Sequence, residues 1–203
     1  MNNFENTLIN GAEKLGMEIK PTQVQQFKIY ADYLLDYNKH TNLTSITEPS
    51  SIAIKHFLDS LLLSKVMGNF EIKMIDIGTG AGFPGMPIKI AHPETEITLV
   101  DSLNKRISFL NGLSQKLNLK VNIFHKRAEE LSKNKAYRDN FDVSVSRAVA
   151  SLNILSEYCM PFVRKNGLFI AMKGPQPEEE IKNAKNAVTA LGGRIEKIEK
   201  LEL

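Results

Sequence analysis

The chain has few of the residues that form disulfides or bind structural metal ions in small proteins. It has one cysteine, Cys159, among 203 residues, so an internal disulfide is excluded. The histidines show no Cys-x-x-Cys or His-x-x-x-His spacing, and we therefore expect no metal site. The four histidines are His40, His56, His92 and His125.

Targeting features are missing as well. The start of the chain, from Met1 to Asn6, has neither the basic residues nor the apolar core of a signal peptide. No apolar run approaches the length of a membrane span. We expect a soluble cytoplasmic protein without a membrane partner. The sequence does not fix the oligomeric state, and a monomer is the simplest expectation.

Charge of one sign is only slightly in excess, with 26 basic and 23 acidic residues. The basic excess lies after residue 70, above all in the segment 120–138. This segment suits a polyanionic partner such as RNA, although a solvated loop and helix face explains it equally well. Its basic residues are Lys120, Lys126, Arg127, Lys133, Lys135 and Arg138, against Glu129 and Glu130.

Residues 1–70 show helical periodicity and predict an N-terminal helical extension. Apolar residues recur every three or four positions from Val24 to Tyr37 and from Ile54 to Val66. Pro21 and Pro49 mark helix starts, because proline loses no hydrogen bond in the first turn. The polar stretch 37–44 is predicted to be an ordered loop.

From residue 72 the pattern changes to short apolar runs that alternate with amphipathic segments. Such alternation predicts an α/β fold with a parallel sheet, here over residues 71–203. The predicted strands are 74–77, 97–100, 121–124, 142–145, 168–172 and a sixth from Arg194. The predicted helices are 86–91, 105–117, 127–133, 151–163 and 178–191.

A glycine-rich turn follows the first predicted strand directly. It runs Asp76-Ile77-Gly78-Thr79-Gly80-Ala81-Gly82-Phe83-Pro84-Gly85. Glycines at three alternating positions let a backbone turn sharply and approach a ligand closely at the carboxyl edge of a sheet. The alternative is a tight strand-to-helix turn without a ligand.

Two cofactor classes fit this turn. Residues 80–85 satisfy the dinucleotide pattern Gly-x-Gly-x-x-Gly, with Asp101 near the spacing of a ribose-binding acid. An NAD(P)-dependent oxidoreductase is therefore one alternative. The position of Asp76, two residues before Gly78, and the lack of a second nucleotide-binding half favour S-adenosylmethionine, whose cationic methionine end the acid would face.

Later residues complete the predicted cofactor site. Asp101 offers two carboxylate oxygens to two ribose hydroxyls, although it could instead cap the following helix. Ala128 and Glu129 follow the third strand, where an adenine would lie. Acids favoured at a helix N-terminus explain Glu129 nearly as well.

Several motifs, in order along nearly the whole chain, resemble the ribosomal RNA small subunit methyltransferase G family, also called glucose-inhibited division protein B. They are residues 42–44 (Asn-Leu-Thr), 56–60 (His-Phe-Leu-Asp-Ser), 76–85, 101–106 (Asp-Ser-Leu-Asn-Lys-Arg), 146–150 (Ser-Arg-Ala-Val-Ala) and 173–174 (Lys-Gly). The resemblance implies a class I S-adenosylmethionine methyltransferase, a Rossmann-like sheet with an N-terminal helical extension. It also implies a bacterial enzyme that methylates N7 of a guanosine in 16S rRNA of the small ribosomal subunit.

By the same resemblance, Gly78 and Phe83 would touch the cofactor, Ala128 and Glu129 would flank its adenine, and Arg147 would close the site. The chain departs from the family pattern by ending directly after the sixth predicted strand, where class I enzymes usually add a seventh, antiparallel one. Either that strand is missing or the sheet edge is built differently.

The chemistry of the acceptor agrees with guanine N7. The chain has no Asn-Pro-Pro-Tyr or Asp-Pro-Pro-Tyr clamp for an amino group, and Cys159 lies in an apolar run, as a small core residue would. N7 carries a lone pair and no proton, so attack on the methyl group needs no general base. Arg147 and Lys173 are therefore predicted to position the reactants. Arg147 is also predicted to be a cofactor-binding residue, placed to meet a cofactor carboxylate or a substrate phosphate, although it could simply pair with Asp101 or Asp76. Another RNA, a protein or a small molecule remains the alternative substrate.

Overall fold

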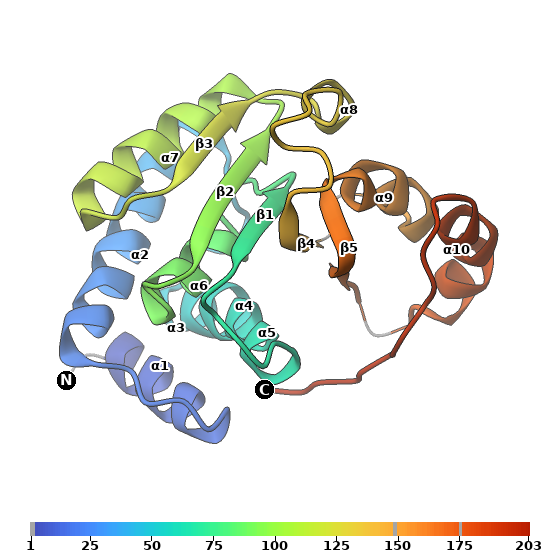
Figure 1. Cartoon of the computed structure of the whole chain (residues 1–203). Helices are drawn as coiled ribbons and strands as arrows, with labels where there is room; N and C mark the ends of the chain where they lie inside the picture. Colours follow the sequence, from blue (N-terminus) through green and yellow to red (C-terminus); the bar gives the residue numbers. More distant parts are fainter. Residues whose placement is uncertain (1–2, 148–149, 175) are drawn as a thin grey trace.

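The computed structural model describes residues 3–147, 150–174 and 176–203. An N-terminal group of helices precedes an alternating α/β segment, as the sequence predicts (Figure 1). The N-terminal elements are α1 (Asn3–Lys14), α2 (Pro21–Thr41), α3 (Pro49–Ile52), the π-helix η1 (Ala53–Leu58), α4 (Asp59–Leu61) and α5 (Leu63–Val66).

Among the described residues, five strands form one parallel sheet in the order β3-β2-β1-β4-β5. The strands are β1 (Lys73–Ile77), β2 (Glu96–Asp101), β3 (Asn122–His125), β4 (Phe141–Arg147) and β5 (Val163–Met172). The helices between and after them are α6 (Gly85–Ala91), α7 (Asn104–Leu117), α8 (Ala128–Leu131), α9 (Leu152–Cys159), the 3-10 helix η2 (Met160–Phe162) and α10 (Glu178–Ala190). The strand order reverses beside β1, and open α/β sheets bind ligands at such a switch point.

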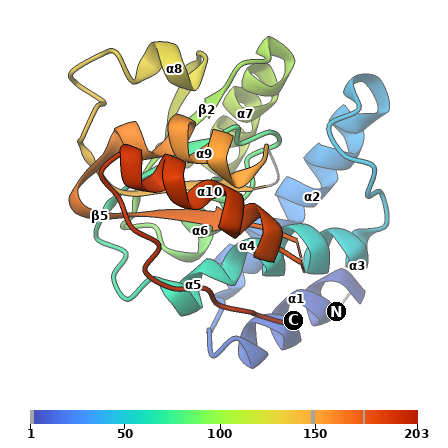
Figure 2. The same ribbon diagram turned by 90° about the vertical axis from the view of Figure 1, so that its right-hand side faces the viewer.

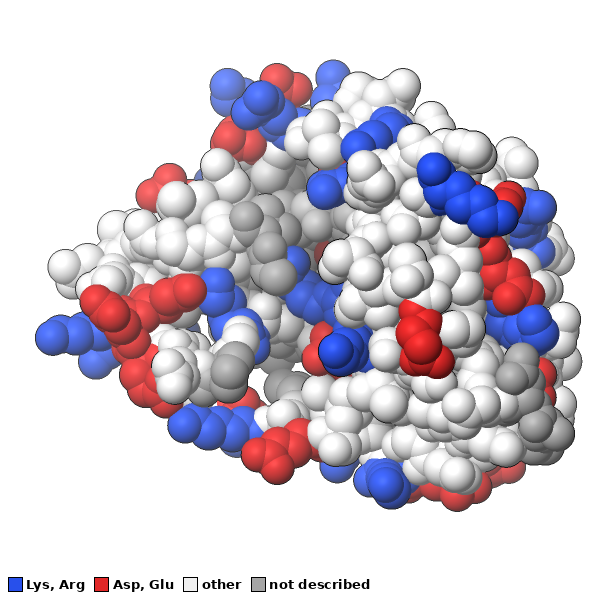
Figure 3. Space-filling model, turned by 180° about the vertical axis from the view of Figure 1, so that it is seen from behind, with Lys and Arg blue, Asp and Glu red and all other residues white. Residues whose placement is uncertain are grey.

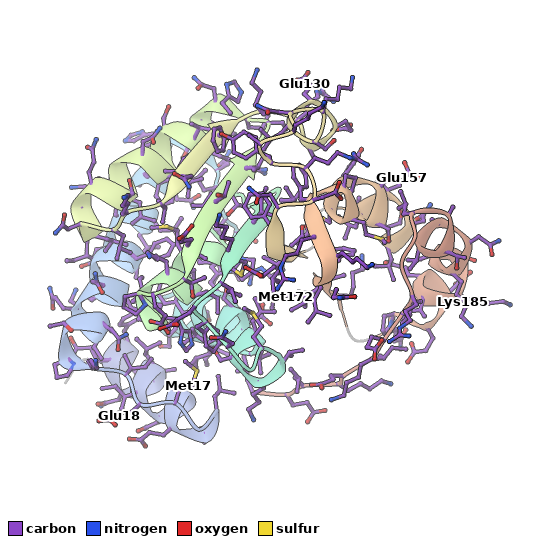
Figure 4. All side chains as sticks on the ribbon, in the orientation of Figure 1. Met17, Glu18, Glu130, Glu157, Met172 and Lys185 are labelled. Carbon is purple, nitrogen blue, oxygen red and sulfur yellow. The ribbon has the colours of Figure 1, made fainter. Side chains whose placement is uncertain are left out.

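Helices cover both faces of the sheet. The larger core joins α6, α7 and the N-terminal helices to one face, where Phe27, Tyr30 and Phe57 are fully buried. Met17 and Met172 also pack against this core (Figure 4). A smaller core joins α8 and α9 to the other face, and α10 packs outside α9 (Figure 2). The N-terminal helices therefore share a hydrophobic core with the sheet.

The predicted strand from Arg194 is wrong, because residues 194–203 form no strand. After α10 the chain runs back toward α4 and α5 (Figures 1 and 2), where Leu201 packs against the larger core. A strand needs a neighbouring backbone to accept its hydrogen bonds, and this path leaves the sheet. Ile198, an apolar residue of this segment, is 55% exposed.

Helix α2 is longer than predicted. It continues through the expected polar loop to Thr41, and Asn42 ends it in the left-handed conformation with φ 49°. The ring of Tyr37 packs edge-on against Phe109, 5.2 Å between centroids, so the apolar stripe of the helix extends one turn further. The prediction of a loop here was based on the polar composition of the segment, and these polar residues lie on the outer face of the last helical turn.

Candidate functional site

A cavity of about 440 Å³ opens at the carboxyl edge of the sheet. Its size lies in the range of small-molecule sites. The ends of β1, β2, β3 and β4 supply most of its lining, and the N-terminal segment supplies the rest. The lining residues include Leu43, Thr44, His56, Gly78, Gly80, Phe83, Asp101, Ser102, Arg106, Lys126, Arg127, Ala128, Glu129 and Arg147.

The glycine-rich turn forms one wall of this cavity. Gly80 has φ +63°, and a Cβ placed on it would meet no atom within 4 Å, so the backbone faces open space. Gly82 lies differently, because its Cβ would stand 2.7 Å from the Tyr30 hydroxyl oxygen and 2.8 Å from Met86 Cγ. Of these two predicted cofactor residues, Gly80 lines the cavity and Gly82 packs against α2 and α6.

Asp76 shapes the turn from behind. It is fully buried and is not among the lining residues; its Oδ2 accepts hydrogen bonds from Thr79 Oγ1 at 2.7 Å and from the Gly85 amide at 2.9 Å. Oδ1 has no partner among the described residues. Burial, only partly offset by these hydrogen bonds, raises the pKa of Asp76 to about 6. The side chain therefore acts on a ligand through the loop that it holds.

Asp101 lines the cavity at the end of β2 and organises two loops. Its Oδ2 accepts from the Gly80 amide and its Oδ1 from the Leu103 amide, each at 2.9 Å. Arg106 adds an ion pair at 3.1 Å. Asp101 is not the N-cap of α7, as the alternative interpretation proposed, because Leu103 takes that position. A ribose diol that binds this carboxylate would have to displace or share Arg106.

Beyond Asp101, the turn from β3 into α8 closes the far end of the cavity. Lys126 to Glu129 line it, with Ala128 buried at the start of α8 and Glu129 exposed. The next residue, Glu130, points outward from α8 (Figure 4). The two residues predicted to flank an adenine thus lie on the cavity, and the acid that follows them does not.

Arg147 lies at the opposite end of the cavity, at the carboxyl end of β4. Its Nη1 contacts Asp59 Oδ2 at 2.7 Å, and its guanidinium lies 4.9 Å from the centroid of the Phe83 ring. The alternative pairing of Arg147 with Asp101 or Asp76 is therefore wrong. The partner comes from α4, at a distance of 88 residues in sequence, which strand spacing alone could not indicate.

His56 completes this end of the cavity and was not identified as a site residue. Its ring stacks on Phe83 with centroids 4.5 Å apart, its Nε2 lies 2.9 Å from Thr44 Oγ1, and its Nδ1 lies 3.4 Å from Arg147 Nη2. Burial first, and then the charge of Arg147, lowers the pKa of His56 to about 4. The motif at residues 56–60 is part of the family resemblance, and this was the one indication of His56 in the sequence. His56 does not follow a strand, so the strand pattern could not place it at the site.

Lys173 and Cys159 lie away from the cavity lining that the described residues form. Lys173 pairs with Glu180 at 2.7 Å and donates to the carbonyl of Ala150 at 2.8 Å. Cys159 is fully buried, and burial raises the pKa of its thiol to about 12. Its interpretation as a core residue is confirmed. Within residues 3–147, 150–174 and 176–203, no cluster of three metal-ligating side chains and no helix able to span a membrane is found.

The cavity fits an extended cofactor with a nucleoside at one end. Strand order places the predicted adenine residues over β3, Asp101 over β2, the open backbone of Gly80 over β1 and Arg147 over β4. Gly80 leaves the loop free to approach a ligand, and the buried carboxyl group of Asp76 lies beneath that loop. Both features suit a cationic sulfonium compound.

Comparison with solved structures identifies the fold. A SAM-dependent methyltransferase from Aquifex aeolicus aligns with a TM-score of 0.56 at 19% identity, over 77% of this chain and 89% of that chain. A putative transferase from Pyrococcus horikoshii aligns with a TM-score of 0.57 at 10% identity, over 91% of this chain and 58% of the other. The fold is the Rossmann-like fold of class I methyltransferases, as predicted.

Comparison of sequences identifies the family. The family model described as rRNA small subunit methyltransferase G (GidB) matches residues 23–202. The Ribosomal RNA small subunit methyltransferase G of Alkaliphilus metalliredigens is 51% identical over 192 residues, which cover 93% of this chain and 80% of the relative. That of Desulforamulus reducens is 44% identical over 205 residues, covering 100% and 85%. This chain therefore belongs to the rRNA small subunit methyltransferase G family.

Proposed function

We propose that this protein transfers a methyl group from S-adenosylmethionine to N7 of a guanosine in 16S rRNA of the small ribosomal subunit. The observation that carries the proposal is the cavity, formed in a member of this family by an open glycine loop, a carboxylate and a half-buried arginine along one sheet edge. S-adenosylmethionine is the cofactor, and when bound it supplies a methyl group activated by a sulfonium.

We assign distinct roles to predicted site residues that line the cavity. Ala128 and Glu129 would hold the adenine, and Asp101 the ribose. The backbone at Gly78 and Gly80 would face the methionine portion. The remaining end, around Arg147, would then receive the acceptor nucleotide, because that end lies beyond the loop. These roles are supported by the order of the strands that carry the residues.

The protein's own residues orient the reactants and exclude water. Guanine N7 loses no proton on methylation, so the chain needs no base. The titratable groups nearby suit this mechanism: His56 has both ring nitrogens engaged, and Asp101 is tied to two backbone amides. Well-aligned reactants gain about 7–11 kcal/mol from proximity, which is a large share of a typical barrier reduction.

RNA would approach over the cavity mouth. Lys126 and Arg127 line the cavity, and exposed Lys133 and Lys135 follow α8 in the same basic segment. Seen from behind, scattered lysine and arginine side chains alternate with acidic groups on a largely uncharged surface, and basic side chains reach into a hollow near the middle of the view (Figure 3). A small number of phosphate contacts therefore fits better than a broad basic face.

Removing these cations tests the approach. The triple variant Lys126→Ala, Lys133→Ala, Lys135→Ala should bind ribosomal subunits more weakly, and its salt slope should be lower by about one for each phosphate that the variant no longer neutralises. Affinity for S-adenosylhomocysteine should be unchanged by calorimetry. Equal salt slopes for variant and parent would exclude the segment from the RNA interface.

The activity itself is tested with methyl-labelled cofactor. Label should enter 16S rRNA when unmethylated small subunits or total RNA are supplied, and cleavage with borohydride and aniline should cut the product at one guanosine. These reagents cut selectively at a guanosine made cationic by N7 methylation. Label in protein or in a small molecule, or RNA label that resists cleavage, would refute the proposal.

A further inference from the structure

The guanidinium of Arg147 is held by groups from two N-terminal elements. Besides the 2.7 Å contact with Asp59, Nη1 donates to the carbonyl of Lys55 at 3.2 Å. Lys55 belongs to the π-helix, in which the amide of Asp59 bonds to the carbonyls of Ile54 and His56. The Lys55 carbonyl accepts from Arg147. Single π-turns of this kind occur frequently at functional sites.

His56 orients the other terminal nitrogen of the guanidinium. Arginine can only donate, so the contact of Nη2 with His56 Nδ1 makes Nδ1 an acceptor and places the ring proton on Nε2. Nε2 then donates to Thr44 Oγ1, which accepts from the Ile46 amide at 3.0 Å. The depressed pKa of His56 agrees with a neutral ring.

The Phe83 ring supports the same assembly. It contacts the His56 ring and the Arg147 guanidinium, and Tyr30 of α2 stacks on it with centroids 5.4 Å apart and planes 7° from parallel. Arg147 is thereby held by an anion, two neutral acceptors and an aromatic ring, with its side chain 16% exposed. A long side chain held in this way has little conformational entropy left to lose when it meets a ligand.

We propose that Asp59 and His56 are positioning residues for Arg147, fixing its guanidinium so that the N–H groups not engaged by them meet an oxygen of the acceptor nucleotide. Asp59 and the Lys55 carbonyl engage Nη1, and His56 engages one N–H of Nη2. Nε makes no hydrogen bond to the other described residues, and Arg147 is one of the residues that line the cavity. The inference rests on the proposed function, because it needs RNA as the acceptor.

A double-mutant cycle tests the coupling. Asp59→Asn should lower kcat/KM for small subunits about tenfold in the parent, as expected for one charge-assisted hydrogen bond. In an Arg147→Ala background the same substitution should have no further effect. The affinity of Asp59→Asn for S-adenosylhomocysteine should stay within twofold of the parent value. Independent, multiplicative effects of the two substitutions, or no effect of Asp59→Asn in the parent, would overturn the inference.

A matched control removes another aspartate–arginine contact. Asp142 pairs with Arg164 at 2.6 Å at the start of β4, the end of the strand away from the cavity. Asp142→Asn should leave kcat/KM unchanged even if its melting temperature falls. Parent-like melting of Asp59→Asn with reduced kcat/KM would separate positioning from a structural role. Equal losses of kcat/KM for both variants would mean that any broken pair impairs the enzyme, and the inference would fall.

Two substitutions of His56 test the assigned tautomer. His56→Asn keeps an acceptor near the Nδ1 position toward Arg147, whereas His56→Gln places its amide near the Nε2 position toward Thr44. His56→Asn should therefore retain more of kcat/KM, and the reverse order would contradict the assignment. If the parent itself labels no RNA, the proposed function fails; if the parent is active and these variants match it, the positioning role alone fails.

Discussion

Replacing Gly80 by alanine should separate ligand binding from folding. The residue adopts φ +63°, which costs an L-residue roughly 1–2 kcal/mol. No atom lies within 4 Å of the added Cβ, so no steric term adds to that cost. For a chain of this size, about 2–4 °C of melting temperature is lost per kcal/mol, so the melting temperature should fall by roughly 2–8 °C. The fold should survive.

The cofactor should respond far more strongly than the fold. The new methyl group projects into the cavity at the point where the backbone must approach the ligand, so affinity for S-adenosylhomocysteine should drop at least about tenfold. Gly80→Asp adds bulk and negative charge and should abolish measurable binding. Isothermal calorimetry gives the affinity, and circular dichroism with thermal melting gives the stability of the same samples.

Two other glycines provide matched controls. Gly16 has φ +75° and also has no atom within 4 Å of its Cβ position, but it lies between α1 and α2. Gly16→Ala should show the same loss of stability with unchanged affinity. Gly82→Ala adds a clash with Tyr30 and Met86, and overpacking of this kind costs about 1–3 kcal/mol more. Equal cofactor affinity in Gly80→Ala and Gly16→Ala would refute the assignment of this loop.

Three further outcomes are expected. Asp101→Asn should weaken cofactor binding by roughly 1–2 kcal/mol in calorimetry, since a neutral amide replaces a charged acceptor. Unchanged affinity with lower stability would mean that Asp101 has only a structural role, through its hydrogen bonds with the Gly80 and Leu103 amides. The pKa of Asp76 is raised from 3.8 to about 6, so its contribution to stability is complete below pH 4 and is lost as the pH rises through 6. Relative to Asp76→Asn, the parent should therefore lose about 3 kcal/mol of unfolding free energy between pH 4 and 7, and a constant difference in chemical denaturation would contradict this. The single-turnover rate should be flat between about pH 7 and 9, because His56 stays neutral there; an acidic limb near pH 7 that His56→Gln removes would contradict the base-free mechanism.

The central strands β1 and β2 could be predicted from sequence because they are buried along almost their whole length and therefore appear as apolar runs, whereas the edge strands β3 and β5 are only partly buried. All five observed strands and the helices between them were identified, with ends displaced by a few residues. The largest displacement is at β5, which begins at Val163 and not at residue 168. The first part of β5 is polar, Asn166 has φ +65°, and the pairing with β4 is irregular. The start of the strand therefore lacks the apolar pattern on which the prediction depended. The predicted strand from Arg194 failed because apolar spacing cannot show whether a partner strand is present.

The candidate site also contains residues that could be predicted from sequence and residues that could not. Gly78, Gly80 and Asp101 could be placed because they follow strands, and strand ends in a parallel sheet converge at one edge. Asp59 and His56 could not, since a helix face is fixed by packing and not by strand order. The π-helical turn that directs them toward Arg147 has no pattern of its own in the sequence, where residues 53–58 have the apolar periodicity of an ordinary helix.

We expect the N-terminal helices to contribute to specificity as well as to stability. Solved methyltransferases and transferases only 10–19% identical to this chain share its sheet, so the sheet alone cannot determine the substrate. In this protein the cofactor end of the cavity is built almost entirely from strand ends and the loops that follow them. The Arg147 end depends on α2, η1 and α4, and the Tyr30 hydroxyl of α2 donates to the carbonyl of Ala81 within the glycine loop itself. A change in the helical segment would thus reach the proposed acceptor end through Arg147 and the glycine loop through Tyr30, while the strand register stays unaltered.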